Sequence, residues 1–337
     1  MQSLIITCVL VIAFILPCFC YESNFITKNA AYNVIDYGAK GDGKTDDSQA
    51  FVKAFQSACR AQGTVSLVIP SNYVFFISAL TLKGPCSSSL QIQVIAFNSC
   101  NKLSVSDLSI VNSPKTHLKI SNCQGAHFSY ISISAPGSSP NTDGIDISDS
   151  KNIIITNSKI ASGDDCISVG SGSSYINISG IACGPGHGIS VGSLGKNHDT
   201  VSDVYVKNCK FTGTTNGARI KTFPGGSGYA KRITFEQITL SQTRNPIIIN
   251  NFYNGQTARL LNGAGVKVSE VTFRGFKGTC THKYAINLNC GPTGCFNIVL
   301  DHNNIVSSQR RKKALCSCNN AHGKATNSIS NCSCLKP

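Results

Sequence analysis

The chain has 337 residues and a formal net charge of +14, from 30 lysine and arginine residues against 16 aspartate and glutamate residues. Strongly basic proteins attract polyanions such as acidic polysaccharides, phospholipid head groups or nucleic acids. The sequence holds no clustered basic and aromatic module of the kind that binds nucleic acid, so that partner is disfavoured. The length suits one elongated domain, which we expect to be a monomer.

An apolar segment opens the chain, from Leu4 to Leu16, and Pro17 and small residues up to Cys20 follow it. This pattern is typical of a secretory signal peptide, although the usual basic residues at its start are missing. A membrane anchor is the alternative, but the apolar run is short for a bilayer span. We therefore expect residues 1–20 to be removed. The remainder, 21–337, is then secreted, extracellular and not attached to a membrane.

The next elements form an N-terminal unit. A strand is expected from Tyr32 to Ala39, and a glycine-rich turn follows it. Residues 41–47 look like a calcium-binding loop but lack its closing glutamate. More simply, Asp46 or Asp47 caps a helix from Ser48 to Cys59, whose apolar residues fall on one face. We expect this helix to cover the open end of a repetitive fold.

Short segments that alternate apolar and polar residues dominate the chain from residue 103 onward, with Gly, Asn and Ser between them. Helical periodicity is almost absent there, which indicates an all-β fold. The regular spacing favours a single-stranded right-handed parallel β-helix, a solenoid of stacked coils, over a sandwich.

A 22-residue repeat within this region carries the candidate chemistry. Three segments read apolar, polar, apolar after one lead residue, and the residues that precede them are Asp143, Asp165 and His187. Strands in register lie about 4.8 Å apart, so these side chains are expected to form a column with Asp164 beside it. The sequence therefore predicts carboxyl groups and an imidazole from separate coils in one patch.

Carboxyl groups so close cannot all ionise easily, so one of them holds a proton and its pKa rises. A general acid beside a general base is what glycoside hydrolysis requires. Arg219 and Lys221 occupy alternate positions of a later strand and project to one face. Two cations beside the acids suit a substrate with its own carboxylates. Each motif alone is also compatible with an ordinary turn or a solvated surface, and the shared register is what favours a site.

Seventeen cysteines, less the three in the expected signal peptide, leave fourteen, an even number that predicts disulfides in a secreted protein. The tail cysteines would form two bridges of undetermined pairing. A zinc site is the alternative for the tail, which the Cys-Ser-Cys spacing and the secreted context disfavour. The expected pairs are Cys166–Cys183, Cys290–Cys295 and Cys59–Cys86, and the tail residues are Cys316, Cys318, Cys332 and Cys334.

Together the motifs resemble the polygalacturonases of glycoside hydrolase family 28, and the plant-type members most closely. The resemblance implies hydrolysis of α-1,4-linked galacturonic acid in pectin with inversion, in the cell wall and without metal or cofactor. The matching segments are Asn-Val-x-Asp-Tyr-Gly-Ala-Lys-Gly-Asp-Gly from Asn33, Asn-Ser-Pro-Lys from Asn112, Ser-Pro-Asn-Thr-Asp-Gly-Ile-Asp from Ser139, Ser-Gly-Asp-Asp-Cys from Ser162, Cys-Gly-Pro-Gly-His-Gly-Ile-Ser from Cys183, and Arg-Ile-Lys from Arg219.

The same resemblance implies a role for each site residue. Asp164 is expected to be the general acid, supported by His187, while Asp143 and Asp165 activate the water. The substrate carboxylate would be bound by Arg219 and Lys221. A sugar ring would contact Tyr253.

The chain departs from the resemblance near its start. Relatives carry further coils with tryptophans between positions that match 94 and 95, whereas here Val94 runs directly into Ile95 and the chain has no tryptophan. We expect about two coils to be missing, which a solenoid tolerates because its contacts join neighbouring coils. A catalytically impaired pectin-binding homologue is therefore one alternative. A calcium-dependent pectate lyase, which shares the β-helix architecture, and a rhamnogalacturonan hydrolase, which the Arg219 and Lys221 pair disfavours, are two others.

The expected surface carries two further signals. The glycosylation sequons begin at Asn177 and Asn331, and a disulfide at Cys332 would compete with the second. The basic run Arg310–Lys313 is expected to be a solvated loop without a catalytic part.

Overall fold

The structure is a computed structural model that describes residues 30–70, 73–76, 81–82, 86–91, 95–253, 265–328 and 332–337. The expected signal peptide, Val94 at the predicted junction and the sequon at Asn331 lie outside these residues. Within the described part, no helix is long and apolar enough to cross a membrane.

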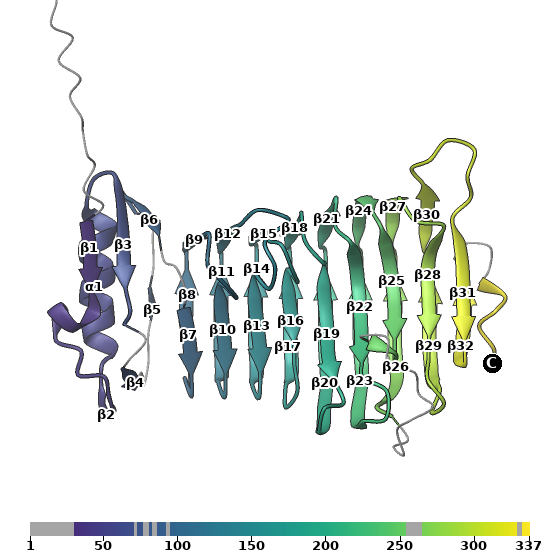
Figure 1. Ribbon diagram of the computed structural model, residues 1–337, viewed down its shortest axis with the longest axis horizontal. Coiled ribbons are helices and arrows are strands. Elements are labelled where there is room, and N and C mark those ends of the chain that lie inside the picture. Colours follow the sequence, from purple (N-terminus) through teal and green to yellow (C-terminus); the bar gives the residue numbers. More distant parts are fainter. Residues whose placement is uncertain are drawn as a thin grey trace, which may run out of the picture.

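Three long sheets of parallel strands run side by side along the molecule, which is a parallel β-helix (Figure 1). The nine-stranded sheet, here the site sheet, comprises β7 (Ile95–Asn98), β10 (Leu118–Ser121), β13 (Ile145–Ser148), β16 (Ile167–Val169), β19 (Ile189–Leu194), β22 (Asn216–Thr222), β25 (Asn245–Asn250), β28 (Tyr284–Asn289) and β31 (Leu315–Asn319).

The other two long sheets complete each coil. The ten-stranded back sheet comprises β5 (Thr81–Leu82), β8 (Ser104–Ser106), β11 (Gln124–Ser129), β14 (Lys151–Thr156), β17 (Ser174–Ser179), β20 (His198–Lys207), β23 (Ser227–Glu236), β26 (Lys267–Arg274), β29 (Cys295–Asp301) and β32 (Ala321–Thr326). The eight-stranded side sheet comprises β9 (Ser109–Val111), β12 (Ser132–Ser134), β15 (Lys159–Ala161), β18 (Ala182–Cys183), β21 (Lys210–Thr212), β24 (Thr239–Thr243), β27 (Lys277–Cys280) and β30 (Asn304–Ser307).

The core lies inside the coils, where equivalent residues stack in columns. Ile145, Ile167 and Ile189 are Cα partners in successive strands of the site sheet, and all three are fully buried. Phe235 and Phe273 stack in the same way at a ring-centroid distance of 5.7 Å. Each coil buries its apolar residues against its neighbours, which is why alternation and a fixed period sufficed to predict the fold.

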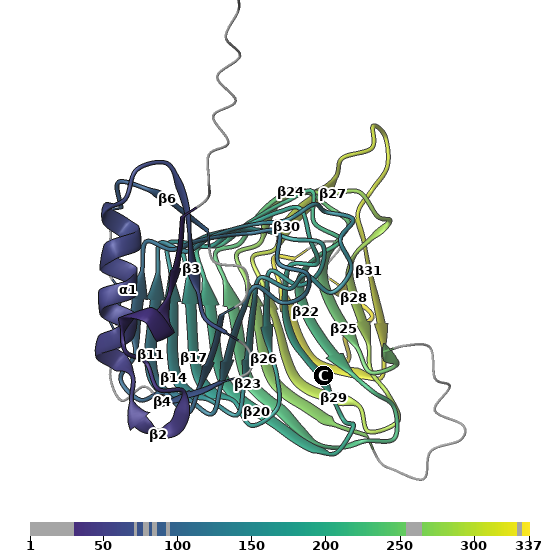
Figure 2. The same ribbon diagram turned by 60° about the vertical axis from the view of Figure 1, so that its left-hand side comes forward.

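The N-terminal unit covers one end of the solenoid (Figure 2). Helix α1 (Ser48–Arg60) buries Phe51 and Phe55 against this end, as expected. The Asp46 carboxylate accepts the Ser48 N–H at 3.0 Å, whereas Asp47 accepts the Lys40 N–H at 2.6 Å and so ties down the glycine-rich turn. The remaining elements of the unit are β1 (Ala30–Asn33), η1 (Val34–Tyr37), β2 (Asp42–Asp46), β3 (Thr64–Val68), β4 (Val74–Phe76) and β6 (Ser89–Gln91).

The sheets change partners at the predicted junction. Strand β6 pairs with β3 in a separate three-stranded sheet, while β7 begins the site sheet four residues later. Among the described strands, only β5 of the N-terminal part joins a long sheet, through its pairing with β8. The junction is thus a discontinuity in the stack, and the loss of coils there stays a prediction.

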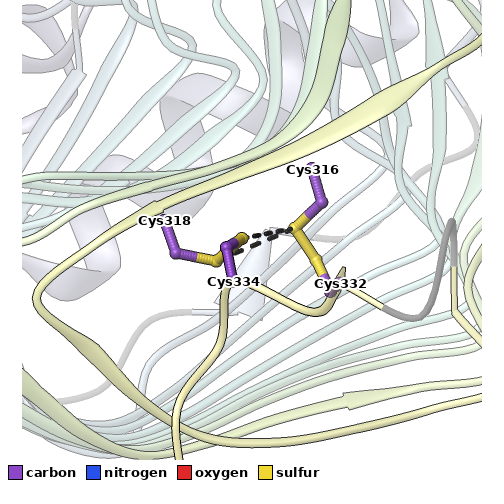
Figure 3. Close-up of side chains that lie close together, drawn as sticks. All are labelled: Cys316, Cys318, Cys332 and Cys334. Atoms are coloured by element: carbon purple, nitrogen blue, oxygen red, sulfur yellow. Dashed lines mark hydrogen bonds between the residues drawn. A yellow bond between two sulfur atoms is a disulfide. The ribbon is translucent and has the colours of Figure 1, made fainter.

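Ten of the fourteen cysteines form disulfides. The bridges Cys59–Cys86, Cys166–Cys183 and Cys290–Cys295 are present as expected. In the tail, Cys316 bonds to Cys332 and Cys318 to Cys334, and Figure 3 shows the four sulfurs gathered together. The expected bridges account for these ten cysteines, and the four for which no pairing was predicted are buried as free thiols: Cys100, Cys123, Cys209 and Cys280.

Candidate active site

The candidate residues lie in the turns that lead from the side sheet into the site sheet. Asp143 precedes β13, Asp164 and Asp165 precede β16, and His187 precedes β19. The three strands pair in register at the 22-residue period, so the predicted column exists. Side-chain atoms of Asp164, Asp165 and His187 all lie within 4.8 Å of one another.

Hydrogen bonds and close packing fix the first two turns against each other. The Gly163 N–H donates to the Thr142 hydroxyl at 2.9 Å, and the Ser162 hydroxyl donates to the Asp164 carbonyl at 3.1 Å. A Cβ at Gly163 would stand 1.9 Å from the Ser139 carbonyl oxygen, so only glycine permits this approach. The local sequence thereby sets the positions of two acidic side chains from adjacent coils.

Asp164 and His187 form a partly exposed pair. His187 Nδ1 lies 2.9 Å from Asp164 Oδ1, and the side chains of His187 and Asp164 are 36% and 21% exposed. Burial raises the pKa of Asp164, but the hydrogen bond and charge of His187 and the charge of Lys221 outweigh it, so the pKa lies below its usual value. Asp164 is therefore ionised in the free protein, and it is open to a ligand.

Asp165 is fully buried beneath the two predicted cations. Arg219 Nη2 donates to its Oδ1, and Lys221 Nζ donates to its Oδ2 at 2.8 Å. The Ser190 hydroxyl also donates to Oδ1, at 2.9 Å. Both oxygens of Asp165 are thus occupied, so in this state the carboxylate holds the cations in place and does not face water. The common orientation predicted for Arg219 and Lys221 is confirmed by these contacts.

Asp143 is a carboxyl group of the cluster whose environment favours the protonated form. Burial and the negative charges of Asp146, Asp164 and Asp165 raise the pKa of Asp143 to about 8. The expectation that crowded carboxyl groups would retain a proton agrees with this pKa. The raised pKa nevertheless belongs to a different residue from the expected general acid, because His187 stabilises the charge of Asp164, whereas the side chains described around Asp143 include no such cation next to its carboxyl group.

Two further residues belong to the site, and neither was singled out from the sequence. Asp146, in β13, accepts a hydrogen bond from the Thr116 hydroxyl at 2.7 Å, and burial raises its pKa. It is the Cα partner of Ser168, which pairs with Ser190, which in turn pairs with Arg219. The polar residue between the two apolar residues of each repeat could have indicated Asp146 from the sequence. These polar residues are aligned from strand to strand, and Arg219 occupies the same position in β22.

The second such residue is His117, which is fully buried next to Asp143. Its Nε2 accepts the Ser113 N–H at 3.3 Å, so its Nδ1 carries the proton and donates to the Asp143 carbonyl at 3.1 Å. Burial lowers the pKa of His117 and keeps the imidazole neutral. His117 therefore positions the turn that carries Asp143.

Tyr253 also comes to the site, as the resemblance implied. Lys221 Nζ lies 5.0 Å from the centre of the Tyr253 ring, and Phe223 meets that ring edge-on at 5.6 Å. The ring is half-buried, which leaves part of it available to a ligand. Asn177, the first residue of the other predicted sequon, lies apart from this cluster and is exposed on β17 of the back sheet.

A metal ion competes poorly for the donor atoms of the cluster. Asp164, Asp165 and His187 offer oxygen and nitrogen ligands at suitable mutual distances. The charge of Asp165, however, is already neutralised by Arg219 and Lys221, and a cation would be repelled by both. The arrangement instead suits an anionic ligand beside an acid–base pair.

Curated plant proteins align with most of the chain. A probable polygalacturonase of Arabidopsis thaliana is 39% identical over 372 residues, which cover 92% of this chain and 82% of that protein. A polygalacturonase of Juniperus ashei is 35% identical and covers 91% of this chain and 74% of its own length. The Arabidopsis alignment is longer than the 337-residue chain itself, so that relative carries segments without a counterpart here.

Solved structures share the fold. The endo-xylogalacturonan hydrolase of Aspergillus tubingensis matches with a TM-score of 0.60 at 22% identity, over 90% of this chain and 97% of that one. Endopolygalacturonase I of Stereum purpureum matches with a TM-score of 0.54 at 17% identity, over 79% of this chain and 90% of its own. The family model of the glycosyl hydrolases family 28 matches residues 90–334, and the chain belongs to this family.

Proposed function

We propose that the chain is a secreted hydrolase that cleaves the α-1,4-galacturonosyl linkages of pectin or polygalacturonate in the cell wall. One observation carries the proposal: Asp143, whose pKa is raised, and Asp164, whose pKa is lowered, lie in one cluster with the cations of Arg219 and Lys221. Acid and base are what hydrolysis of a glycosidic bond needs, and fixed cations suit a uronate substrate.

In the proposed reaction, Asp164 protonates the glycosidic oxygen as its bond to C1 breaks. Asp143 takes a proton from the water that attacks C1 from the opposite face, which inverts the configuration. The proton of the free cluster must therefore pass from Asp143 to Asp164 when substrate binds. The bound sugar would drive this transfer, because it displaces water from Asp164 and strengthens the burial that already raises its pKa.

Arg219 and Lys221 are proposed to bind the carboxylate of the sugar while they remain paired with Asp165. Their shared contact with Asp165 fixes both side chains before substrate arrives, which reduces the entropy lost on binding. Water activation is assigned to Asp143 rather than Asp165, because both oxygens of Asp165 are already hydrogen-bonded.

Leaving-group chemistry tests these roles. We expect Asp164→Asn to slow the hydrolysis of polygalacturonate by about 10²- to 10⁴-fold, as loss of general acid catalysis does. An aryl galacturonoside with a good leaving group needs no protonation, so the same variant should cleave it at close to the normal rate. Asp143→Asn should slow both substrates, and Asp203→Asn, on the back sheet, should slow neither. Undiminished hydrolysis of the polymer by Asp164→Asn would contradict the assignment.

A catalytically impaired pectin-binding protein is the second candidate, and the raised pKa of Asp143 favours it. The carboxyl group assigned to activate water has a pKa of about 8, and while it is protonated it cannot accept a further proton. Titration with size-defined oligogalacturonides separates the two functions, since the impaired protein would bind them and release no new reducing ends.

A further inference from the structure

Positive charge is concentrated in the C-terminal part of the chain. Residues 238–337 contain 12 lysines and arginines but only two acidic residues, Glu270 and Asp301. Asp301 is paired with Arg274 at 2.9 Å and lies on β29 of the back sheet, and Glu270 lies on β26 of the same sheet. Neither acidic residue therefore lies in the turns that lead from the side sheet into the site sheet, where the candidate active-site residues also lie.

Four basic residues do lie in that row. Arg244 precedes β25, Lys283 precedes β28, and Lys312 and Lys313 precede β31. All four are exposed. Figure 1 shows the turn between β30 and β31 rising at the edge of the solenoid where the turns before β13, β16 and β19 also lie. Each of the three coils that follow the Arg219 and Lys221 coil toward the C-terminus thus carries at least one further exposed cation.

The last of these residues line a cavity. Lys283, Lys312 and Lys313 surround a space of about 520 Å³ together with His282, Gln309 and Thr281. Gln309 Nε2 donates to the Thr281 carbonyl at 3.3 Å, and the Leu315 N–H donates to the Lys283 carbonyl at 2.9 Å. These bonds join the turns of two adjacent coils, so the cavity, here the basic pocket, has a fixed frame.

Two aromatic side chains lie at the basic pocket: His282 lines it, and Tyr284 lies beside two of its lining residues. Lys283 Nζ lies 5.1 Å from the centre of the Tyr284 ring, and His282 lies 5.9 Å from the same ring. Aromatic rings offer an apolar face to a sugar, and the ammonium groups and the amide of Gln309 offer donors to carboxylates and hydroxyls. Such a lining fits an acidic sugar better than a simple inorganic anion.

We propose that the basic pocket is a distant binding subsite for the same acidic polysaccharide, and that it holds uronate residues beyond the cleavage site. This inference rests on the proposed function. Strands β28 and β31 are four and five coils from β16 in the order of the site sheet, which corresponds to roughly 19 and 24 Å along the axis. The pocket should therefore increase the affinity for long chains and leave short ones unaffected.

A charge-matched pair of variants tests this. The pocket variant combines Lys283→Gln, Lys312→Gln and Lys313→Gln. The control variant combines Lys151→Gln, Lys231→Gln and Lys324→Gln on the back sheet, so that both lose the same net charge. Dissociation constants are measured by calorimetry for oligogalacturonides of increasing length at one ionic strength, alongside the hydrolysis rate of the shortest oligomer that is cleaved.

In the unmodified protein we expect the affinity for oligogalacturonides to increase with a distinct step at the length that reaches from the candidate active site to the basic pocket. The pocket variant should lose about tenfold in affinity for those long oligomers only, since three exposed charge contacts contribute modestly each. Its hydrolysis of the short oligomer should be unchanged, and the control variant should bind like the unmodified protein.

The contrary outcomes are distinct. Equal affinity of the pocket and control variants for long oligomers, with cleavage intact, would overturn the subsite and leave the proposed function standing. If the pocket variant lost as much affinity for a sulfated polysaccharide as for galacturonan, the pocket would be a general anion-binding surface. That result would overturn the uronate assignment. Absence of any galacturonan binding by the unmodified protein would overturn the proposed function and the subsite with it.

Discussion

Substitution of Asp143 by asparagine should stabilise the protein at neutral and alkaline pH. The pKa of this carboxyl group is raised from 3.8 to about 8 in the folded protein, so folding keeps a proton that the unfolded chain releases. The contribution of Asp143 to stability is therefore largest below pH 4, falls as the pH rises toward 8, and is level above it. The asparagine side chain of the variant would resemble the protonated acid in shape and carry no charge, so the variant avoids this loss.

The size of the effect follows from the shift. About four pH units at about 1.4 kcal/mol each give an upper value of about 6 kcal/mol at pH 8, and partial solvent exposure of Asp143 reduces this to about 2–4 kcal/mol. The difference between the variant and the unmodified protein should be near zero at pH 4.

Urea unfolding at pH 4, 6 and 8 measures this difference directly. Asp203→Asn is a control of opposite sign, because the hydrogen bond from Arg232 lowers the pKa of Asp203 and stabilises the folded state above pH 4. That variant should be slightly less stable at neutral pH, and its deficit should vanish as the pH falls. A difference for Asp143→Asn that does not grow between pH 4 and pH 8 would refute the placement of the proton.

Three further predictions concern the rest of the site and the core. His117→Phe leaves the Ser113 N–H unpaired, so we expect about 1–3 kcal/mol of lost stability. Its kcat should fall at constant KM because the Asp143 turn shifts; an unchanged kcat would argue against a positioning role. Lys221→Met removes one cation from buried Asp165 and should cost about 3–5 kcal/mol in urea unfolding, while Lys196→Met, at an exposed residue, should cost almost nothing. A thiol reagent should label Cys100, Cys123, Cys209 and Cys280 in the unreduced protein only after denaturation, and labelling of the native protein would contradict their burial.

The sequence predicted the architecture and the position of the column because both depend on register. With a repeat of 22 residues, only one alignment of the coils keeps the apolar residues inside. Asp143, Asp165 and His187 therefore had to occupy equivalent positions, each just before a strand of the site sheet. The face shared by Arg219 and Lys221 followed from alternation within one strand. These properties are local or periodic, and composition with spacing suffices for them.

Burial and protonation were not predictable in the same way. Asp165 and Asp164 are adjacent in the chain, yet one is enclosed by Arg219, Lys221 and Ser190 while the other is open beside His187. Their different environments depend on His187 and Ser190 from the next coil and on Arg219 and Lys221 from the coil after it. The location of the proton follows from these contacts, and so does the difference from the expected general acid.

Core chemistry was the other gap. The sequence did not indicate which cysteines stay free, and Cys209 is enclosed in the apolar core as a small apolar side chain, with the pKa of its thiol raised by burial to about 12. His117 was also missed, because a histidine at the start of a strand carries no periodic signal. Its two hydrogen bonds become visible only when the turns before β10 and β13 are brought together.

The direct test of the central claim is the release of reducing ends from polygalacturonate by the purified protein in the presence of a chelator. The account predicts steady release of saturated products, whose first-formed anomer is inverted, at a rate that Asp164→Asn reduces at least about 100-fold. Binding without release, products that absorb in the ultraviolet as unsaturated sugars do, or dependence on calcium would contradict it.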